Sequence, residues 1–269
     1  MGSATEKGSA LRILLFLITL GFATGAAADG GLFSMQSRED GRNWEAVGRL
    51  ELAGKAFCTG ALIAPDLVLT AAHCLYDPTT GAEIPVEDIQ FLAGWRNGRA
   101  AAYRRVRRAK THPDYAFDDP ARADRVRNDI ALIKLQLPIR NTTITPFATG
   151  PHPPRGAEVS VVSYAYDRSE APSLQGMCSV LDRQTRMLVL SCRVDFGSSG
   201  SPVFSFAGGE PRIVSVISAK AEAEGREVSL GTELDETLTL LRAELETNAV
   251  RNTLDAGTRR ETGAKFIRP

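Results

Sequence analysis

Short runs of apolar and β-branched residues recur along the chain, separated by segments rich in Gly, Pro, Asp and Asn. Runs of this length between turn signals are typical of strands, and helical spacing is scarce before residue 230. The pattern therefore predicts an all-β fold, either a sandwich or a barrel. The predicted strands are 46–52, 57–63, 67–70, 89–93, 130–135, 159–163, 188–192, 202–206 and 213–219.

The strands fall into two groups separated by a stretch rich in Pro, Thr and Gly. We interpret residues 44–140 and 157–232 as two strand-rich domains joined by a connector over 141–156. Further along, Leu238, Leu241 and Leu245 are spaced by three and four residues, which predicts an amphipathic helix over 233–250 that packs on the body. A polar tail follows over 251–269.

The first 28 residues have the pattern of a secretory signal peptide: Lys7 and Arg12 precede or open an apolar run over 13–22, and small residues follow as far as Ala28. We expect cleavage after Ala28, because the apolar run is short for a membrane anchor. The mature protein is then secreted or periplasmic, without stable membrane insertion. Residues 29–43 are an N-terminal segment or a short propeptide.

Charge gives little sign of an unusual partner. The chain has 32 basic and 32 acidic residues, and removal of residues 1–28 leaves a formal charge of −1. This balance argues against nucleic acid as a partner. One basic cluster spans 103–112, but its charges do not share one strand face, so we interpret it as a solvated edge strand.

Four cysteines form two pairs that are close in sequence: Cys58 with Cys74, and Cys178 with Cys192. Export to an oxidising compartment favours disulfides. Three pairings are possible for four cysteines, and we expect these two because each closes within its own half of the chain. The spacing lacks the CxxC or HxxxH pattern of a zinc site, and we expect no metal or organic cofactor.

The chain has three histidines, so a histidine-dependent mechanism has few candidates. His73 directly follows a predicted strand and precedes Cys74, and a crosslinked strand end is a rigid mount for an imidazole. His112 and His152 are assigned to the surface. Asp129 lies at the start of the apolar run in NDIALIKL, where a partly buried carboxylate needs a hydrogen-bonding partner such as an imidazole. A strand-capping or turn role is the alternative for Asp129.

The stretch FGSSGSPVF over 196–204 is either a flexible linker or a tight turn that holds one hydroxyl in place. Apolar strands on both sides favour the turn. A nucleophilic Ser199 would need a base, a group that orients the base, and N–H donors for the developing oxyanion. Gly197 has no Cβ and lets the backbone turn its N–H inward, so we assign the oxyanion hole to the N–H groups of Gly197 and Ser199.

Three sequence blocks, CTGALIAPDLVLTAAHC, NDIALIKL and GSSGSPVF, resemble in their order the catalytic blocks of the chymotrypsin-like serine proteases, especially the bacterial branch related to glutamyl endopeptidases. The resemblance covers about residues 44–233. It implies two antiparallel six-stranded β-barrels with the site between them, His73 as general base, Asp129 as its orienting group and Ser199 as nucleophile. The implied protein is a monomeric exported endopeptidase that cleaves protein or peptide substrates through an acyl-enzyme.

Other hydrolase classes fit less well. An α/β-hydrolase needs a histidine after its serine, and none follows Ser199. A subtilisin-like order needs an aspartate before His73, and no aspartate there has a matching context. A cysteine protease would use Cys58 or Cys74, which are better used in a crosslink. The alternative that remains is a protease-like binding module without turnover.

The sequence also departs from relatives of this kind. Ser198 stands where zymogen-activated members have an aspartate that pairs with the new N-terminus, so we expect no activation of that type. The resemblance implies that Arg193 lies at the floor of the substrate pocket, where an inward-facing guanidinium would favour substrates with an acidic side chain at the cleaved position. We expect Arg193 to face outward instead, because a neighbouring disulfide can place it at the surface and an unpaired buried charge is costly. The strand IVSVISAK, which contains Ile217 and Ser218, is expected to form the wall of the substrate pocket, and Ser218 aligns with a serine that supports the catalytic aspartate in relatives. Ile217 stands where the glutamate-specific enzymes have histidine, so it does not support glutamate specificity.

Overall fold

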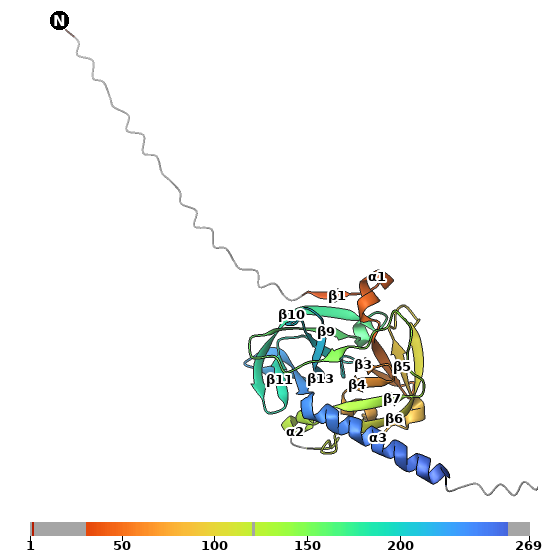
Figure 1. Cartoon of the computed structure of the whole chain (residues 1–269). Coiled ribbons are helices and arrows are strands. Elements are labelled where there is room, and N and C mark those ends of the chain that lie inside the picture. The colour runs from red at the N-terminus through yellow and green to blue at the C-terminus, as the bar shows by residue number, and fades with distance from the viewer. Residues whose placement is uncertain (1, 3–30, 120–121, 258–269) are drawn as a thin grey trace, which may run out of the picture.

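A computed structural model describes residues 2, 31–119 and 122–257. Figure 1 shows a body of two neighbouring β-barrels and a long C-terminal helix along one side. The predicted signal peptide lies outside the described residues apart from Gly2, as does the end of the predicted tail, residues 258–269.

The first barrel is closed by six strands in the order β2-β3-β4-β7-β6-β5. Each strand pairs antiparallel with its two neighbours. Every residue of β4 is buried, and so is every residue of β7 except Lys134, so both faces of these two strands are covered, in agreement with their nearly continuous apolar sequences. The strand bounds are β2 Val47–Leu52, β3 Ala56–Ala64, β4 Leu67–Thr70, β5 Ile89–Ala93, β6 Ala102–Thr111 and β7 Ala131–Leu135.

The second barrel also contains six antiparallel strands, β9-β10-β11-β14-β13-β12, and closes through pairing of β9 with both β12 and β10. Two short strands extend this sheet: β1 pairs with β10, and β8 pairs in parallel with β13. The two-barrel fold predicted from the resemblance is therefore confirmed. The bounds are β1 Leu32–Ser34, β8 Ala148–Thr149, β9 Glu158–Ser163, β10 Ser173–Gln184, β11 Met187–Leu190, β12 Pro202–Ser205, β13 Arg212–Ala223 and β14 Arg226–Glu233.

The basic segment predicted as an edge strand is strand β6, and this prediction is wrong in one respect. β6 pairs with β5 on one side and with β7 on the other, so it has no free edge. Ala102 and Val106 are buried in the core, whereas Arg104 is half-buried and Arg105 and Arg107 are exposed. Closure of the barrel gives every strand two neighbours, so β6 has no edge.

The connector between the barrels is attached to both of them. The N–H of Phe147 donates to the carbonyl of Leu62 in the first barrel, and the N–H of Gly150 donates to that of Ile213 in the second. The ring of Phe147 packs 4.7 Å from that of Phe204 and 5.7 Å from that of Trp44, measured between centroids. These contacts fix the position of one barrel relative to the other, which a site between them requires.

In the part of the chain that the structure describes, three α-helices lie outside the barrels: α1 Arg38–Gly41, α2 Arg122–Arg127 and α3 Asp235–Gly257. Helix α3 lies beside β6 and β7 of the first barrel, buries Leu238, Leu241 and Leu245, and accepts a hydrogen bond from Arg108 at the carbonyl of Leu245. It continues beyond the predicted end at residue 250 as far as Gly257, because no Gly or Pro interrupts the sequence before that point.

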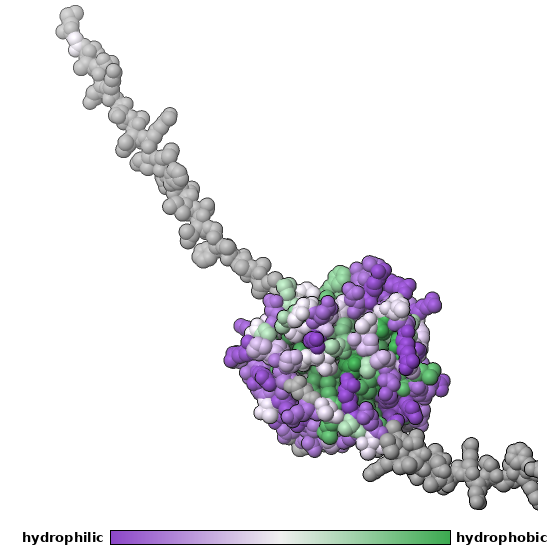
Figure 2. Space-filling view, in the orientation of Figure 1, coloured by the Kyte–Doolittle hydropathy of each residue, from purple (hydrophilic) through white to green (hydrophobic). Residues whose placement is uncertain are grey.

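Hydropathy varies across the face of the molecule seen in Figure 2. Polar residues surround a central apolar area, which coincides with the place of β3, β4 and β13 in Figure 1. Within residues 2, 31–119 and 122–257, no helix is both long and apolar enough to cross a bilayer.

Candidate active site

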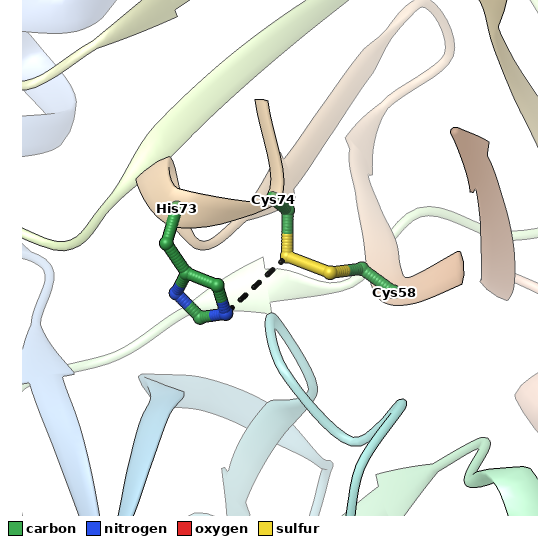
Figure 3. A group of neighbouring side chains, drawn as sticks. All are labelled: Cys58, His73 and Cys74. Carbon is green, nitrogen blue, oxygen red and sulfur yellow. Dashed lines mark hydrogen bonds between the residues drawn. A yellow bond between two sulfur atoms is a disulfide. The ribbon is translucent and has the colours of Figure 1, made fainter. Parts of the chain in front are cut away.

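His73 lies in a 3₁₀ turn, Ala72–Leu75, that directly follows β4. A disulfide joins Cys74 in this turn to Cys58 in β3, and a second disulfide joins Cys178 to Cys192, so both predicted pairings are confirmed. Figure 3 shows the imidazole beside the first disulfide, with Nε2 3.9 Å from the sulfur of Cys74. The crosslink thus fixes the turn that carries the imidazole.

Asp129 lies between α2 and β7, and its side chain is only 4% exposed. Its carboxylate accepts a hydrogen bond from the backbone N–H of His73 at 2.8 Å and contacts ring Nδ1 at 2.7 Å. The Ser218 hydroxyl donates to the same carboxylate. Because a carboxylate only accepts, the ring proton belongs on Nδ1, and Nε2 of the neutral ring is the basic nitrogen.

Two opposing effects act on the pKa of His73. Burial favours the neutral ring and is the largest single influence, and the positive charge of Arg125 also lowers the pKa. The charge of Asp129 and its hydrogen bond together outweigh them and raise the pKa above the ordinary value of 6.5. The geometry therefore strengthens the ring as a base.

The group in Figure 3 also has the residue types of a metal site, since ligand atoms of Cys58, His73 and Cys74 lie within 4.8 Å of one another. Zinc binds cysteine as the thiolate. Both sulfurs here form the disulfide instead, and neither can supply a thiolate. These residues therefore do not fit a metal, and the group is a histidine beside a crosslink.

Ser199 lies in the turn that precedes β12, and it is half-buried. Its carbonyl accepts a hydrogen bond from the N–H of Thr59 at 2.8 Å, which places this turn against the residue that follows Cys58. The structure therefore brings the turn to the disulfide that adjoins His73. Among the described residues, no hydrogen bond joins the Ser199 hydroxyl to the imidazole.

In this turn, the backbone N–H groups of Gly197 and Ser199 point away from the hydrogen bonds that hold the neighbouring carbonyls. The carbonyl of Phe196 accepts from the N–H of Tyr166 at 2.9 Å, and that of Ser198 accepts from Ser201 at 3.1 Å. A trans peptide points its N–H opposite to its carbonyl, so the N–H groups of Gly197 and Ser199 face the other way. Neither donates to another group in the described part of the chain. Gly197 has a φ of +94°, which few residues other than glycine adopt.

The remaining predicted residues have different surroundings. Arg193 is exposed, and its backbone N–H donates to the side chain of Gln175. Ile217 is buried in the core of the second barrel. Ser198 is also buried, with its hydroxyl 3.4 Å from the carbonyl of Tyr164. The assignment of Arg193, Ile217 and Ser218 to a substrate pocket stays a prediction.

The two histidines assigned to the surface are not on it. His112 is 5% exposed and lies 2.6 Å from the guanidinium of Arg186, while the side chain of His152 is 9% exposed and pairs with Glu233. These neighbours belong to the second barrel, which covers both rings. The residues that bury these two histidines are distant in the sequence, so the sequence around each histidine could not predict its burial.

A cavity of about 910 Å³ lies elsewhere, among the connector, β9, and the β12–β13 hairpin. None of His73, Asp129 and Ser199 lines it. We therefore locate the candidate site by its hydrogen bonds rather than by the volume of a cavity.

Comparison with known proteins gives matches across both barrels. The trypsin family profile matches residues 35–238. Glutamyl endopeptidase of Bacillus licheniformis is 28% identical over 148 residues, which are 55% of this chain and 45% of that protein. Human cathepsin G is 31% identical over 137 residues, which are 50% of this chain and 49% of that protein. The matched regions thus span about half the length of these relatives.

A solved structure of a Glu endopeptidase in complex with MPD superimposes with a TM-score of 0.66 and 18% sequence identity, covering 82% of this chain and 98% of the other. At this identity the likeness supports the fold alone. The family profile covers most of the chain, including both barrels and the residues described above. The chain belongs to the trypsin family.

Proposed function

We propose that this protein is an exported serine endopeptidase that cleaves protein or peptide substrates through an acyl-enzyme, with Ser199 as nucleophile, His73 as general base and Asp129 as its orienting group. The observation that carries the proposal is the pair of hydrogen bonds between Asp129 and His73, at 2.8 and 2.7 Å. This pair presents a basic Nε2 beside the Cys58–Cys74 disulfide, and the Ser199 turn is hydrogen-bonded to Thr59, the residue that follows Cys58.

In the proposed reaction, the Ser199 hydroxyl attacks the carbonyl carbon of a peptide bond while its proton passes to Nε2 of His73. The Asp129 carboxylate stabilises the imidazolium that forms. The imidazolium then gives its proton to the leaving amine, and the acyl group remains on Ser199 as an ester. Water, deprotonated by the same histidine, hydrolyses the ester and restores the serine.

The N–H groups of Gly197 and Ser199 would stabilise the oxyanion of each tetrahedral intermediate. Two findings support this assignment: both groups lack a partner within the described chain, and the carbonyls of Phe196 and Ser198 are anchored. No movement of an N-terminus is needed to form this arrangement, since the turn is held by Ser198 and its neighbours. Metal and organic cofactors have no part in these steps.

The alternative is a protease-like binding module without turnover, and one observation favours it: the Ser199 hydroxyl makes no hydrogen bond to His73 in the described structure. Catalytic hydrogen bonds are often long in unliganded enzymes and shorten when substrate binds. Labelling with a fluorophosphonate tests the two functions. An endopeptidase is labelled at Ser199 and loses labelling as Ser199→Ala, with casein cleavage lost in parallel. A folded wild-type protein that neither labels nor cleaves is the binding module.

A further inference from the structure

Thr59 is a buried threonine of β3 in the first barrel, and all of its polar groups bond to other residues. Its N–H donates to the carbonyl of Ser199 at 2.8 Å, and its hydroxyl donates to the carbonyl of Gly197 at 3.0 Å. The same hydroxyl accepts from the N–H of Tyr164 at 3.0 Å. One residue of the first barrel thus binds the nucleophile turn of the second at two points.

We propose that Thr59 is a positioning residue for the oxyanion hole: its hydroxyl holds the peptide between Gly197 and Ser198, and through it the two donor N–H groups. The proposal goes beyond the proposed function but relies on its site. The Gly197–Ser198 peptide lies between the peptides that carry the N–H groups of Gly197 and Ser199. Fixing its carbonyl therefore limits how the two donors can rotate relative to each other.

The surroundings of Thr59 make its hydroxyl hard to replace. Thr59 and Tyr164 are completely buried, and Gly197 is buried as well, so water cannot easily satisfy the groups that the hydroxyl binds. Without the hydroxyl, the carbonyl of Gly197 and the N–H of Tyr164 each lose a partner, and leaving buried polar groups unpaired is costly. Rotation of the Gly197–Ser198 peptide toward another donor would relieve this cost and would disturb the donors.

Thr59 itself is held from the opposite side. The hydroxyl of Thr70, in the neighbouring strand β4, donates to the carbonyl of Thr59 at 2.9 Å. The same two threonines form the wall against which Gly200 packs: a Cβ on Gly200 would lie 2.1 Å from the Thr70 hydroxyl and 2.3 Å from the Thr59 carbonyl. The turn therefore fits against a rigid pair of strands rather than against a single movable side chain.

The arrangement also accounts for how the turn is ordered although Ser198 replaces the aspartate of zymogen-activated relatives. A buried ion pair with a new N-terminus is not available here. Bonds from Thr59 in one barrel and from Ile217 in the other, whose carbonyl accepts from the N–H of Gly200 at 2.8 Å, hold the turn from both sides. The turn that carries the oxyanion donors is thereby held by hydrogen bonds from both barrels.

The test compares Thr59→Val, which keeps the shape of the side chain, with Thr59→Ser, which keeps the hydroxyl. Fluorophosphonate labelling of the full-length exported protein gives both a rate constant and a final labelled fraction. We expect Thr59→Val to label about 10–100-fold more slowly, since removal of a whole oxyanion donor costs about 10²–10³-fold. The final labelled fraction of Thr59→Val should equal that of wild type. Thr59→Ser, which keeps the hydroxyl, should be labelled at a rate within about 3-fold of the wild-type rate.

The matched control is Ser215→Ala, which deletes an equally buried hydroxyl that donates to the carbonyl of Thr232 in the second barrel. The Ser215→Ala variant should unfold at a lower urea concentration than wild type but should be labelled by the fluorophosphonate at the wild-type rate. The proposal is overturned if Thr59→Val labels at the wild-type rate, or if Ser215→Ala slows labelling as much. If Thr59→Val does not fold, Thr59→Ala is measured with the same criteria. A wild-type protein that is not labelled at Ser199 overturns the proposed function instead.

Discussion

The carboxylate of Asp129 holds His73 at two points, the backbone N–H at 2.8 Å and ring Nδ1 at 2.7 Å. The first bond fixes the turn that carries the histidine, and the second fixes both the ring and the position of its proton. One buried carboxylate thus determines where Nε2 lies and that it is the basic nitrogen. The chemistry proposed for Ser199 depends on this orientation.

The pH dependence of kcat/KM should follow the titration of His73. The protonated ring cannot accept the serine proton, so activity is lost as the pH falls through the pKa of His73 and is regained as the pH rises. Because Asp129 raises this pKa despite burial, the midpoint should lie above 6.5. Initial rates of peptide cleavage at low substrate concentration, measured from pH 5 to 9, check this. A profile that is flat through this range would argue against His73 as the base.

Replacement of Asp129 by asparagine should reduce kcat by about 10⁴-fold, since the amide can stabilise the wrong ring tautomer and carries no charge. The midpoint of any remaining activity should shift downward, because the largest influence that raises the pKa of His73 is lost. Ser218→Ala is the comparison, as it removes a donor to the same carboxylate but leaves its charge. It should retain most of the activity. Equal losses in the two variants would contradict a role for the charge of Asp129.

Much of this site could be predicted from the sequence because its residues follow or precede apolar strands. His73 and Asp129 stand at the ends of β4 and β7, which pair with each other, so strand pairing brings their ends together. The disulfides followed from spacing within each half of the chain. The role of Thr59 could not be predicted, because its hydroxyl binds residues 138 and 105 positions away and its own sequence context is that of an ordinary strand.

Two strands of the second barrel were missed for a different reason. β10 loses its alternation at a bulge between Gln175 and Cys178, where Met177 has a φ of +55° and is exposed. β14 contains few apolar residues, and its polar residues Ser229 and Thr232 are buried.

The misinterpretation of β6 as an edge strand has another cause. Whether a strand has a free edge depends on closure of the barrel, which the sequence of that strand alone does not indicate.

Gly200 should not tolerate a side chain. Its φ is +76°, and a Cβ would lie 2.1 Å from the Thr70 hydroxyl and 2.3 Å from the Thr59 carbonyl, so the turn would have to move. We expect Gly200→Ala to abolish fluorophosphonate labelling. Gly209→Ala is the matched control, because Gly209 also has a positive φ, +86°, but has open space around it. It should lose only about 1 kcal/mol of stability through backbone strain and label normally.

Helix α3 should contribute to stability through its buried face. Leu241 is completely buried against the first barrel, whereas the adjacent Leu240 is 41% exposed. Leu241→Ala should lower the free energy of unfolding by about 2–5 kcal/mol, as expected when a buried leucine leaves a cavity. Leu240→Ala should change it by less than about 1 kcal/mol. Urea unfolding of the two variants measures both values, and similar losses would mean that α3 does not use this face for packing.

The two disulfides should differ in their effect on activity although they close loops of similar length, with sequence separations of 16 and 14. Because the loops are of similar length, replacing both cysteines of either pair by alanine should lower the free energy of unfolding by a similar amount, about 3 kcal/mol. Cys58 and Cys74 adjoin Thr59 and His73, while Cys178 and Cys192 lie in the core of the second barrel.

We therefore expect removal of Cys58 and Cys74 to slow fluorophosphonate labelling of the folded protein, and removal of Cys178 and Cys192 to slow it less. Unfolding experiments on both double variants establish that the losses in stability are comparable, and labelling is then measured at a temperature where each is folded. If the first pair can be removed without slowing the reaction, the crosslink stabilises the barrel but does not position His73. The hydrogen bonds from Asp129 would then suffice to hold the imidazole.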